Sequence, residues 1–405
     1  MSYMTHFDVP TPDPALSRKA AIVGLGETDF HLDYQAARAK PDGYEAPTSE
    51  SLAIKAFERA LADSGLRRED IDGLGVNFLY GGPSSEEMAK TLGLTPRYTP
   101  ERGGGICAGP LPVAATAIAE GKCDTIALIF SVATRSIGRT FGGNKMDDGP
   151  SSYYYHHPWG WSSQAAHWAL IWTHYQQVYG AKEEDLAAVA VQLRQNAMRN
   201  PNAVMQSELT VEKYLASRYV VRPLHLFDLC LVNDGAVCLI VRRTDLAKGM
   251  AHAPVEIGGW GRASVTRNKM HTLVRERMRT QYQESGRQML EMAGIGLGDV
   301  QHFEGYDAST IHLIDHLEGH GFVEPGQGLE FFKSGKAAIG GTLPVNTGGG
   351  ILSGSYMHGW SHVAEIVRQL RHEAGPRQVK DVEVSMFSLA QTDQVHPVLF
   401  MRGAK

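Results

Sequence analysis

A tyrosine and a histidine, Tyr356 and His358, lie in a stretch that contains seven glycines within residues 340–359. Glycine costs about 1 kcal/mol per position in a helix interior, so this stretch is not a helix. Glycine also lets the backbone approach a ligand closely. The apolar spacing in residues 363–370 predicts a helix, and a helix start offers free N–H groups and the positive end of the helix dipole. The stretch therefore predicts one wall of an active site.

The cysteines and histidines lack the spacing of a metal site. The four cysteines form no C-x-x-C pair, which argues against structural zinc and indicates a reducing compartment. His312 and His316 are four residues apart on a predicted helix, but without the glutamate of an H-E-x-x-H motif. We therefore expect no metal ion. The cysteines are Cys107, Cys123, Cys230 and Cys238, and the other histidines considered are His156, His157 and His320.

Length and composition limit the possible classes of protein. The 405 residues suffice for two ordinary domains or one duplicated fold, and a hydrophobic fraction of 43% predicts a substantial core. A net charge of -5 without a long basic run argues against nucleic acid as a partner. The polar start of the chain is unlike a signal peptide, and no apolar run reaches membrane-spanning length. These features predict a soluble, cytoplasmic protein.

The first elements of the chain have clear signals. Residues 19–26 predict a buried strand that ends at glycines, although these glycines lack the rest of a dinucleotide-binding fingerprint. An apolar stripe predicts a helix over residues 48–64, capped by Thr48 or Ser49 and stopped at Gly65. A second strand is predicted at residues 71–78.

Two patterns occur twice. A glycine-rich loop, a helix and a buried strand follow one another in residues 101–132, as they do in residues 348–389. Residues 60–72 likewise resemble residues 289–301, because each segment contains a helix end, a glycine cap, a short linker and a strand. The repeats predict an α/β fold of two related halves with a mixed or parallel sheet.

These repeats divide the chain into parts. We expect a loose N-terminal arm at residues 1–18, a first half at 19–250 and a second half at 251–405. An insertion at about residues 135–220 is rich in tyrosine and tryptophan, several of them on a predicted helix at 163–179. Long insertions are usually functional. Its aromatic side chains either fill a core or dimer interface or line an apolar substrate channel.

Several motifs resemble those of the thiolase superfamily, along nearly the whole chain. Residues 223–236 are similar to the segment that carries the last strand of the first half in that family. Residues 346–350 (NTGGG) resemble the N-x-x-G-G that precedes the catalytic histidine of thiolases. Residues 305–308 (GYDA) stand where sterol-carrier-protein-type thiolases have His-Asp-Cys-Phe. The resemblance implies a duplicated thiolase-like fold in which helices and mixed sheets are layered as αβαβα.

The chain departs from thiolases at the catalytic positions. The catalytic histidine of the family falls on Tyr356, and the histidine of His-Asp-Cys-Phe falls on Tyr306. Residues 388–391 contain no cysteine where the second catalytic cysteine would lie. The nucleophilic cysteine falls on Gly104 in the ungapped alignment that we favour, or on Cys107 if three residues are deleted. Thiolysis is not expected, because it needs a thiolate and a His/Cys pair.

The pattern of two tyrosines, with Asp307 after the first and His358 after the second, resembles the steroid side-chain-cleaving aldolases of this superfamily. The resemblance implies retro-aldol cleavage of a β-hydroxyacyl-CoA, with a steroid or bile-acid side chain, to a ketone and a short acyl-CoA such as propionyl-CoA. It also implies a small OB-fold partner, often belonging to a hydratase, and a homodimer. Coenzyme A would be part of the substrate, and no cofactor is expected.

Retro-aldol chemistry needs a base for the hydroxyl proton, a stabiliser of the thioester enolate and an acid. We assign Tyr356 as the base and Tyr306 as the donor at the enolate, and the reverse order stays open. The pKa of free tyrosine is about 10, so the environment must tune one of the pair. A Schiff-base aldolase is not expected, because neither motif contains lysine.

The neighbours of the tyrosines have supporting roles in this hypothesis. Asp307 and His358 would orient the tyrosines. Backbone N–H groups of Gly348, Gly349 and Gly350 would bind the enolate oxygen.

Two other functions are compatible with the sequence. A C-acyltransferase of thiolase fold would use Cys107 as its nucleophile, with a histidine from residues 156–157 or position 358. A non-catalytic scaffold subunit would bind acyl-CoA without turnover. Replacing Cys107 by alanine separates the first alternative from an aldolase, because only the acyltransferase needs the thiol.

Overall fold

The computed structural model describes residues 9–100, 107–139, 157–159, 161, 163–264, 275–391 and 394–405. Gly104, the position favoured for the missing nucleophile, lies outside these residues, as do Tyr153, Tyr154, Tyr155 and His156 of the insertion.

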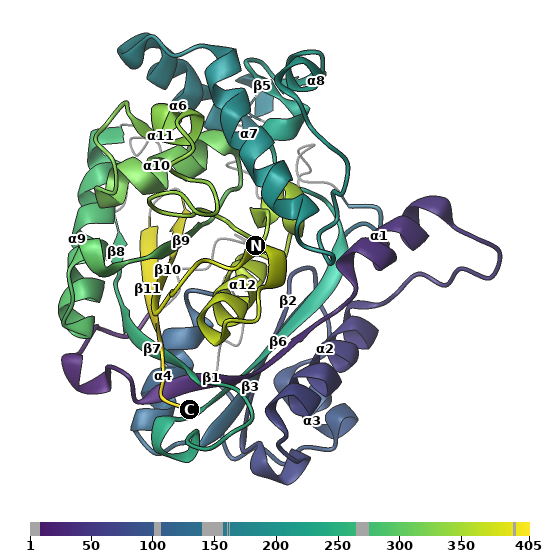
Figure 1. Cartoon of the computed structure of the whole chain (residues 1–405). Helices are drawn as coiled ribbons and strands as arrows, with labels where there is room; N and C mark the ends of the chain where they lie inside the picture. The colour runs from purple at the N-terminus through teal and green to yellow at the C-terminus, as the bar shows by residue number, and fades with distance from the viewer. Residues whose placement is uncertain are drawn as a thin grey trace.

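Among the described residues, nine strands form one mixed sheet in the order β2-β3-β6-β1-β7-β11-β10-β9, with β8 paired to β11 (Figure 1). A separate two-stranded ribbon joins β4 and β5. The bounds are β1 Ala20–Glu27, β2 Gly73–Phe78, β3 Thr125–Ala133, β4 Tyr219–Val221, β5 Leu224–His225, β6 Asp234–Arg243, β7 Val255–Trp260, β8 Ala263–Ser264, β9 His302–Gly305, β10 Val384–Gln391 and β11 Gln394–Arg402.

The order of strands is the same when read inward from either edge. In the first half β2 and β3 are parallel, and β3–β6 and β6–β1 are antiparallel. In the second half β9 and β10 are parallel, and β10–β11 and β11–β7 are antiparallel. A short antiparallel contact between β1 and β7 joins the halves. This repetition confirms the predicted duplicated α/β fold.

The long helix of each half lies on a pair of glycines. Helix α2 (Ser49–Ser64) packs on β1, where a Cβ at Gly26 would lie 2.0 Å from the carbonyl oxygen of Ala56. Helix α9 (Arg275–Ala293) packs on β7, and a Cβ at Gly261, directly after that strand, would lie 1.8 Å from the carbonyl oxygen of Ser285. The glycines after the predicted first strand are therefore needed for close helix packing.

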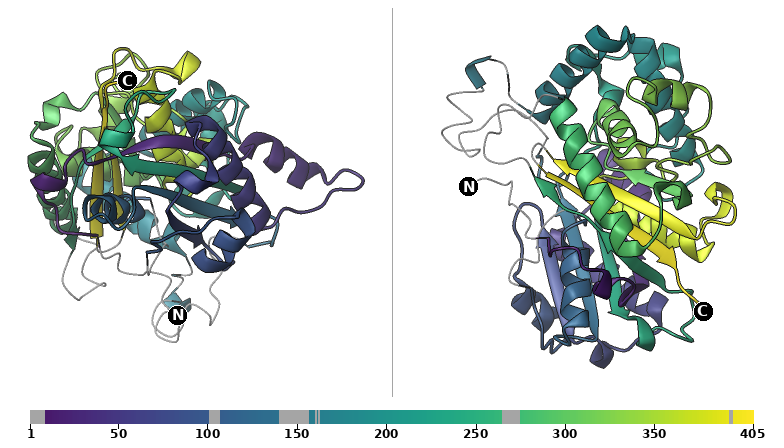
Figure 2. Two further views of the ribbon diagram at one scale, coloured as in Figure 1. Left: turned by 90° about the horizontal axis from the view of Figure 1, so that it is seen from below. Right: turned by 90° about the vertical axis from the view of Figure 1, so that its left-hand side faces the viewer.

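Two shorter helices cross the junction of the halves. Helix α4 (Pro110–Ala119) and helix α12 (Trp360–Arg371) each contact β1 and β6 of the first half and β7 of the second half. They occupy the same place in the two repeats, after the two glycine-rich loops. Figure 1 and the side view in Figure 2 show α12 against the sheet where the halves meet.

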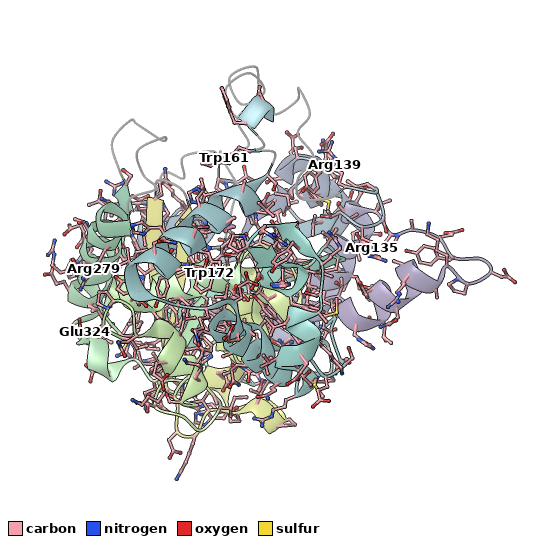
Figure 3. The ribbon with its side chains drawn as sticks, turned by 90° about the horizontal axis from the view of Figure 1, so that it is seen from above. Arg135, Arg139, Trp161, Trp172, Arg279 and Glu324 are labelled. Carbon is pink, nitrogen blue, oxygen red and sulfur yellow. The ribbon has the colours of Figure 1, made fainter. Side chains whose placement is uncertain are left out.

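The described part of the insertion is largely helical, and half of its described tyrosine and tryptophan side chains are core residues. Trp172 and Tyr175 of helix α6 (Gln164–Tyr179) are fully buried, and Figure 3 labels Trp172 on this helix. Trp159 is 84% exposed. The other α-helices are α1 Phe30–Ala39, α3 Ser85–Leu92, α7 Glu183–Met198, α8 Val211–Leu215, α10 Thr310–His320 and α11 Gly328–Lys333.

The start of the described chain is not the loose arm that the sequence predicts. The carbonyl oxygen of Pro10 accepts a hydrogen bond from the Trp260 indole at 2.9 Å, and that of Val9 accepts one from Arg262 at 2.6 Å. Val9 is also buried in the main core. Residues 9–18 therefore belong to the packed structure, because β7 and the residues after it offer both polar and apolar partners.

A helix that spans a membrane must be both long and apolar. None of the helices in the described part of the chain combines these two properties to the extent that a bilayer requires.

Candidate active site

The first predicted tyrosine directly follows strand β9. The amide of Tyr306 donates to the carbonyl oxygen of Ser388 at 2.9 Å, which continues the β9–β10 pairing by one residue. Next to it, the Asn346 side chain accepts from the amide of Gly305 at 2.8 Å and donates to its carbonyl at 2.9 Å. The Asn346 side chain thus forms two backbone hydrogen bonds of the kind that a neighbouring strand would form. It joins the segment of Tyr306 to the glycine loop.

The second predicted tyrosine faces the first. Tyr306 is 7% exposed and Tyr356 is 6% exposed, and a hydrogen bond joins their hydroxyl groups. Burial raises the pKa of both phenols well above the usual value. The interaction between the two hydroxyls does not reverse the rise that burial causes in either pKa. The structure therefore brings together the two side chains predicted to be catalytic, both in the neutral form.

The sequence predicts that the glycine loop leads directly into a helix, and this prediction is wrong. A single π-helical turn, η9 (Gly350–Gly354), follows the glycines, and α12 begins only at Trp360. The turn forms because Asp307 accepts the amides of Ile351 at 2.9 Å and Leu352 at 3.2 Å. Gly350 has a φ of +59°, and a Cβ there would lie 2.1 Å from a carboxylate oxygen of Asp307.

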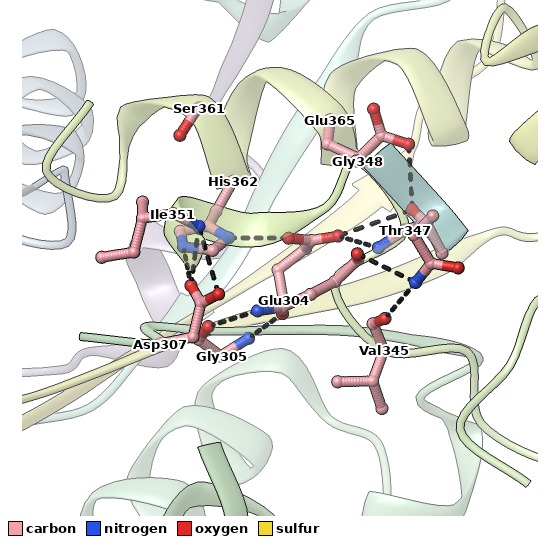
Figure 4. Close-up of polar contacts among 12 residues, drawn as sticks. Glu304, Gly305, Asp307, Val345, Thr347, Gly348, Ile351, Ser361, His362 and Glu365 are labelled. Atoms are coloured by element: carbon pink, nitrogen blue, oxygen red, sulfur yellow. Dashed lines mark hydrogen bonds and ion pairs between the residues drawn. The ribbon is translucent and has the colours of Figure 1, made fainter. Parts of the chain in front are cut away.

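The carboxylate of Asp307 belongs to a buried charged cluster (Figure 4). Nε2 of His362 lies 3.1 Å from Asp307, and Nδ1 of the same ring lies 2.7 Å from Glu304. Burial lowers the pKa of His362, but the two carboxylates outweigh this effect and raise it to about 9. Burial raises the pKa of Glu304, but hydrogen bonds from His302 and His362 leave it below its usual value.

The predicted enolate-binding role of Gly348, Gly349 and Gly350 is only partly compatible with the loop. The amide of Gly349 already donates to the carbonyl oxygen of Asn346 at 2.9 Å, because the loop turns sharply at this point. Gly348 and Gly350 line a small cavity beside the charged cluster. The tyrosines are not among the described residues that line it; these include Glu304, His362, Glu365 and Arg368.

Three asparagines from the first half hold the loop that leads to Tyr356. The Asn196 side chain donates to the carbonyl oxygens of Val345 and Asn346, both at 3.1 Å, and Asn200 donates to that of Gly348 at 3.1 Å. The side chain of Asn233 accepts from the amide of Tyr356 at 2.8 Å. These contacts fix the loop backbone in addition to those of Asp307.

His358 lies beside both tyrosines. Its ring centroid is 6.1 Å from that of Tyr306 and 5.9 Å from that of Tyr356, and its backbone φ is +50°. Burial lowers the pKa of His358 to about 3, so the ring is neutral. Its Nδ1 has no hydrogen-bond partner among the described residues. His358 is therefore placed to contact the tyrosines or a bound substrate.

The cysteines are not arranged for nucleophilic catalysis. Cys107 is fully buried in the main core, and burial raises the pKa of its thiol well above the usual value. Cys230 lies nearer the tyrosines, and burial, together with the Asp307 charge, raises its pKa to about 12. In the segment 388–391, where the second thiolase cysteine would lie, the buried hydroxyl of Ser388 lies 2.9 Å from His316 Nδ1 and 2.7 Å from His320 Nε2.

The three histidines of α10 stack as buried rings rather than as ligands. His312 lies 4.0 Å from the Trp168 ring and 4.6 Å from the His316 ring, between centroids. Burial lowers the pKa of His320 to about 3 and places those of His312 and His316 well below the usual value. Across the described residues, no group of three or more His, Cys, Asp or Glu side chains could hold a metal ion.

The fold and the pair of tyrosines can be compared with known proteins. The thiolase C-terminal domain-like family matches residues 263–392. A steroid side-chain-cleaving aldolase of Thermomonospora curvata is 34% identical over 87% of this chain and 90% of its own length. The 17-hydroxy-3-oxo-4-pregnene-20-carboxyl-CoA lyase of Mycobacterium tuberculosis is 32% identical over 88% and 92%.

A solved structure agrees with these relatives. The Ltp2-ChsH2(DUF35) aldolase superposes with a TM-score of 0.83 at 30% sequence identity, covering 96% of this chain and all of that one. The repeated sheet and the glycine-built site define a protein of the thiolase superfamily. Within that superfamily, the chain belongs to the family of steroid side-chain-cleaving aldolases.

Most of the side chains that support the candidate site could not be predicted from the sequence. Glu304 directly precedes the GYDA motif and His362 follows His358 by four residues, but neither belongs to a motif, and they pair with each other across 58 residues. Asn196 and Asn200 likewise belong to no motif, and their partners are distant in sequence. Only Asn233 had a signal, since it lies in the N-D-G-A segment on which the resemblance rests.

Proposed function

We propose that this chain catalyses retro-aldol cleavage of a β-hydroxyacyl-CoA whose acyl group is a steroid or bile-acid side chain. The products are a ketone and a short acyl-CoA such as propionyl-CoA. The observation that carries the proposal is the hydrogen-bonded pair Tyr306–Tyr356, buried at the two positions where thiolases have histidines. The names of the similar enzymes, an aldolase and a CoA lyase, support the same reaction class.

The hydrogen bond between the phenols suggests how two neutral tyrosines can work together. The β-hydroxyl gives its proton to the oxygen of Tyr356, and Tyr356 passes its own proton to Tyr306 along the existing hydrogen bond. Tyr306 in turn protonates the α-carbon as the bond between the α- and β-carbons breaks and the β-carbon becomes a ketone. Each tyrosine gains and loses one proton, so no isolated phenolate has to form in a buried site.

The other groups of the site have smaller parts in this proposal. His358 contacts the pair and orients it, and Asp307 fixes the turn that precedes Tyr356. Of the three glycines, Gly348 and Gly350 are the ones whose N–H groups we propose for the thioester enolate oxygen. The reaction uses no cofactor, since coenzyme A is carried by the substrate itself.

The assembly is also a proposal. The solved neighbour is named for an aldolase together with a ChsH2(DUF35) component. We propose that this chain also acts with a small OB-fold partner and forms a homodimer. A cytoplasmic location fits the four free cysteines and the use of coenzyme A thioesters.

The test is turnover of a 17-hydroxy steroid coenzyme A ester with a C22-type side chain, with and without an OB-fold partner. Wild type should release the ketone and the acyl-CoA. Tyr306→Phe and Tyr356→Phe should each lower kcat by about 10³-fold or more, because either change interrupts the proton path; a single general acid–base group contributes 10²–10⁴-fold. Tyr219→Phe is the control: it removes a tyrosine hydroxyl that donates to Glu183, away from the tyrosine pair, and should leave kcat unchanged.

The same assay separates the alternatives. Cys107→Ala should retain activity, because the thiol is buried and its pKa is raised. Loss of activity in Cys107→Ala, with both tyrosine variants active, would establish acyl transfer instead. Binding of the acyl-CoA ester without turnover, even with the partner present, would establish a scaffold subunit.

A further inference from the structure

We infer that the buried Glu304–His362–Asp307 cluster sets the separation of the two tyrosine hydroxyls, with His362 as the positioning residue. The inference rests on the proposed function of the tyrosine pair. It assigns a task to a charged group that contacts neither tyrosine hydroxyl.

Both carboxylates of the cluster connect the segments that carry the tyrosines. Glu304 and Asp307 flank Tyr306 in the chain. Glu304 accepts the amide of Thr347 at 2.9 Å, while Asp307 accepts the amide of Ile351 at 2.9 Å. Thr347 and Ile351 belong to the loop that leads to Tyr356. A shift of either carboxylate therefore moves one tyrosine relative to the other.

His362 must be charged for this arrangement to hold. Nδ1 lies 2.7 Å from Glu304, and Nε2 lies 3.1 Å from Asp307 in an ion pair. A neutral imidazole has one donor and one acceptor nitrogen, so one lone pair would face a carboxylate oxygen. All three side chains are at most 1% exposed, and two buried carboxylates without a cation would carry a large desolvation cost. The raised pKa of His362 agrees with a permanent imidazolium at neutral pH.

Among the described residues, the other side chain in direct contact with the cluster that can carry a positive charge is His302. His302 lies 3.1 Å from Glu304 and is shared with Ser385. Glu365 is paired with Arg377 and reaches the cluster only through the hydroxyl of Thr347. The rings of Tyr306 and Phe387 lie on the remaining sides of His362, with centroids 6.4 Å and 5.6 Å away, and His316 adds a neutral ring from α10. Within this part of the chain, His362 is therefore the side chain that faces both carboxylates, whereas His302 contacts Glu304 alone.

Charge compensation tests the inference in the purified enzyme with its partner. His362→Gln keeps a side chain of similar size but leaves two facing carboxylates, and kcat should fall about 100-fold with KM within twofold, since small misplacements of reacting groups cost about this much. Adding Glu304→Gln to His362→Gln restores the net charge of the cluster and should recover at least tenfold. His396→Gln is the control and should stay within twofold, because this buried histidine has no carboxylate contact among the described residues.

A second readout does not depend on turnover. Tyrosine labelled with ¹³C at the ζ carbon reports the hydrogen bond between the phenols by NMR. The signals of Tyr306 and Tyr356 should shift in His362→Gln, return toward wild type in the double variant, and stay unchanged in His396→Gln. Histidine ¹⁵N spectra should show His362 as an imidazolium at pH 7 and His396 as neutral.

The outcomes separate the two proposals. Unchanged tyrosine signals in folded His362→Gln, or a neutral His362 at pH 7, would overturn the positioning role whether or not the enzyme is active. Shifted and then restored signals in a protein without lyase activity would support the positioning role and refute the proposed reaction. If the double variant had the same kcat and the same tyrosine signals as His362→Gln, the net charge of the cluster would not be what positions the tyrosines.

Discussion

The side chains of this site take their protonation states from their immediate neighbours. Tyr306 and Tyr356 are neutral because burial raises the pKa of each phenol. His358, beside them, is also neutral because burial lowers its pKa, whereas His362 is charged because two carboxylates face its ring. Two histidines four residues apart therefore hold opposite protonation states at neutral pH. The candidate site combines a neutral pair of tyrosines with a charged cluster.

At the residue scale, His362 makes stability depend on pH. The pKa is raised from 6.5 in the unfolded chain to about 9 in the fold, so the folded state binds the proton more tightly. The resulting stabilisation, of about 3 kcal/mol, is fully present below pH 6.5 and is lost as the pH rises through 9. Denaturant unfolding of wild type and His362→Gln at pH 6 and pH 9.5 should show a smaller difference at the higher pH. Equal differences at both pH values would contradict this prediction.

How far the sequence reveals the site depends on how local each signal is. Tyr306, Asp307, Tyr356 and His358 stand in short motifs and could be predicted by resemblance. Glu304 and His362 could not, because they pair across 58 residues of sequence and each is an ordinary residue of a strand or a helix. Proximity of this kind is a product of the fold.

At the scale of elements, the turn between the glycine loop and α12 is the part that pattern reading placed wrongly. Periodicity located α12 well, but the stretch before it has no periodic signal. There the backbone follows a side chain from another segment, Asp307, which accepts the amides of η9. The predicted helix at 48–64 and the predicted strands succeeded because their own residues carry the signal.

Gly350 allows a matched test of this turn. Gly350→Ala and Gly375→Ala place alanine at the same φ of +59°, which costs about 1–2 kcal/mol in each. Only at position 350 would the new Cβ meet Asp307, since nothing lies within 4 Å at Gly375. Gly350→Ala should therefore lower kcat at least 100-fold, while Gly375→Ala changes stability alone. Similar kcat values in steady-state assays of the two variants would refute a role of Asp307 in shaping the turn.

At the scale of the whole molecule, the duplication is visible in the packing as well as in the strand order. Gly24 and Gly26 lie under α2, and Gly259 and Gly261 lie under α9 in the same spacing. Short patterns that occur twice in the sequence predict the two related halves. The packing of residues 9–18 against the second half could not be predicted, because a polar, proline-bearing segment has no periodic pattern from which its packing partner could be inferred.

The two helix–glycine contacts should respond alike to mutation. Gly26→Ala and Gly261→Ala would each drive a Cβ into the backbone of a packed helix and should destabilise the protein by about 3 kcal/mol or more. Gly298→Ala is the control, because a Cβ at this position would have no atom within 4 Å and the φ of Gly298 is not positive. Urea unfolding gives the comparison. A loss in only one of the two halves would argue against equivalent packing.

The loop that leads to Tyr356 is supported by Asn196, Asn200 and Asn233, and this has a consequence for how the protein can be divided. Every acid–base group proposed here lies in residues 251–405, yet the backbone carrying Tyr356 is held by side chains from residues 19–250. If the chain were expressed as two pieces cut between the halves, one piece would contain all the proposed acid–base groups. The other would contain the asparagine side chains that hold their loop in place. Activity would then be a property of their reassembly, and would report on complementation of the fragments rather than on either piece.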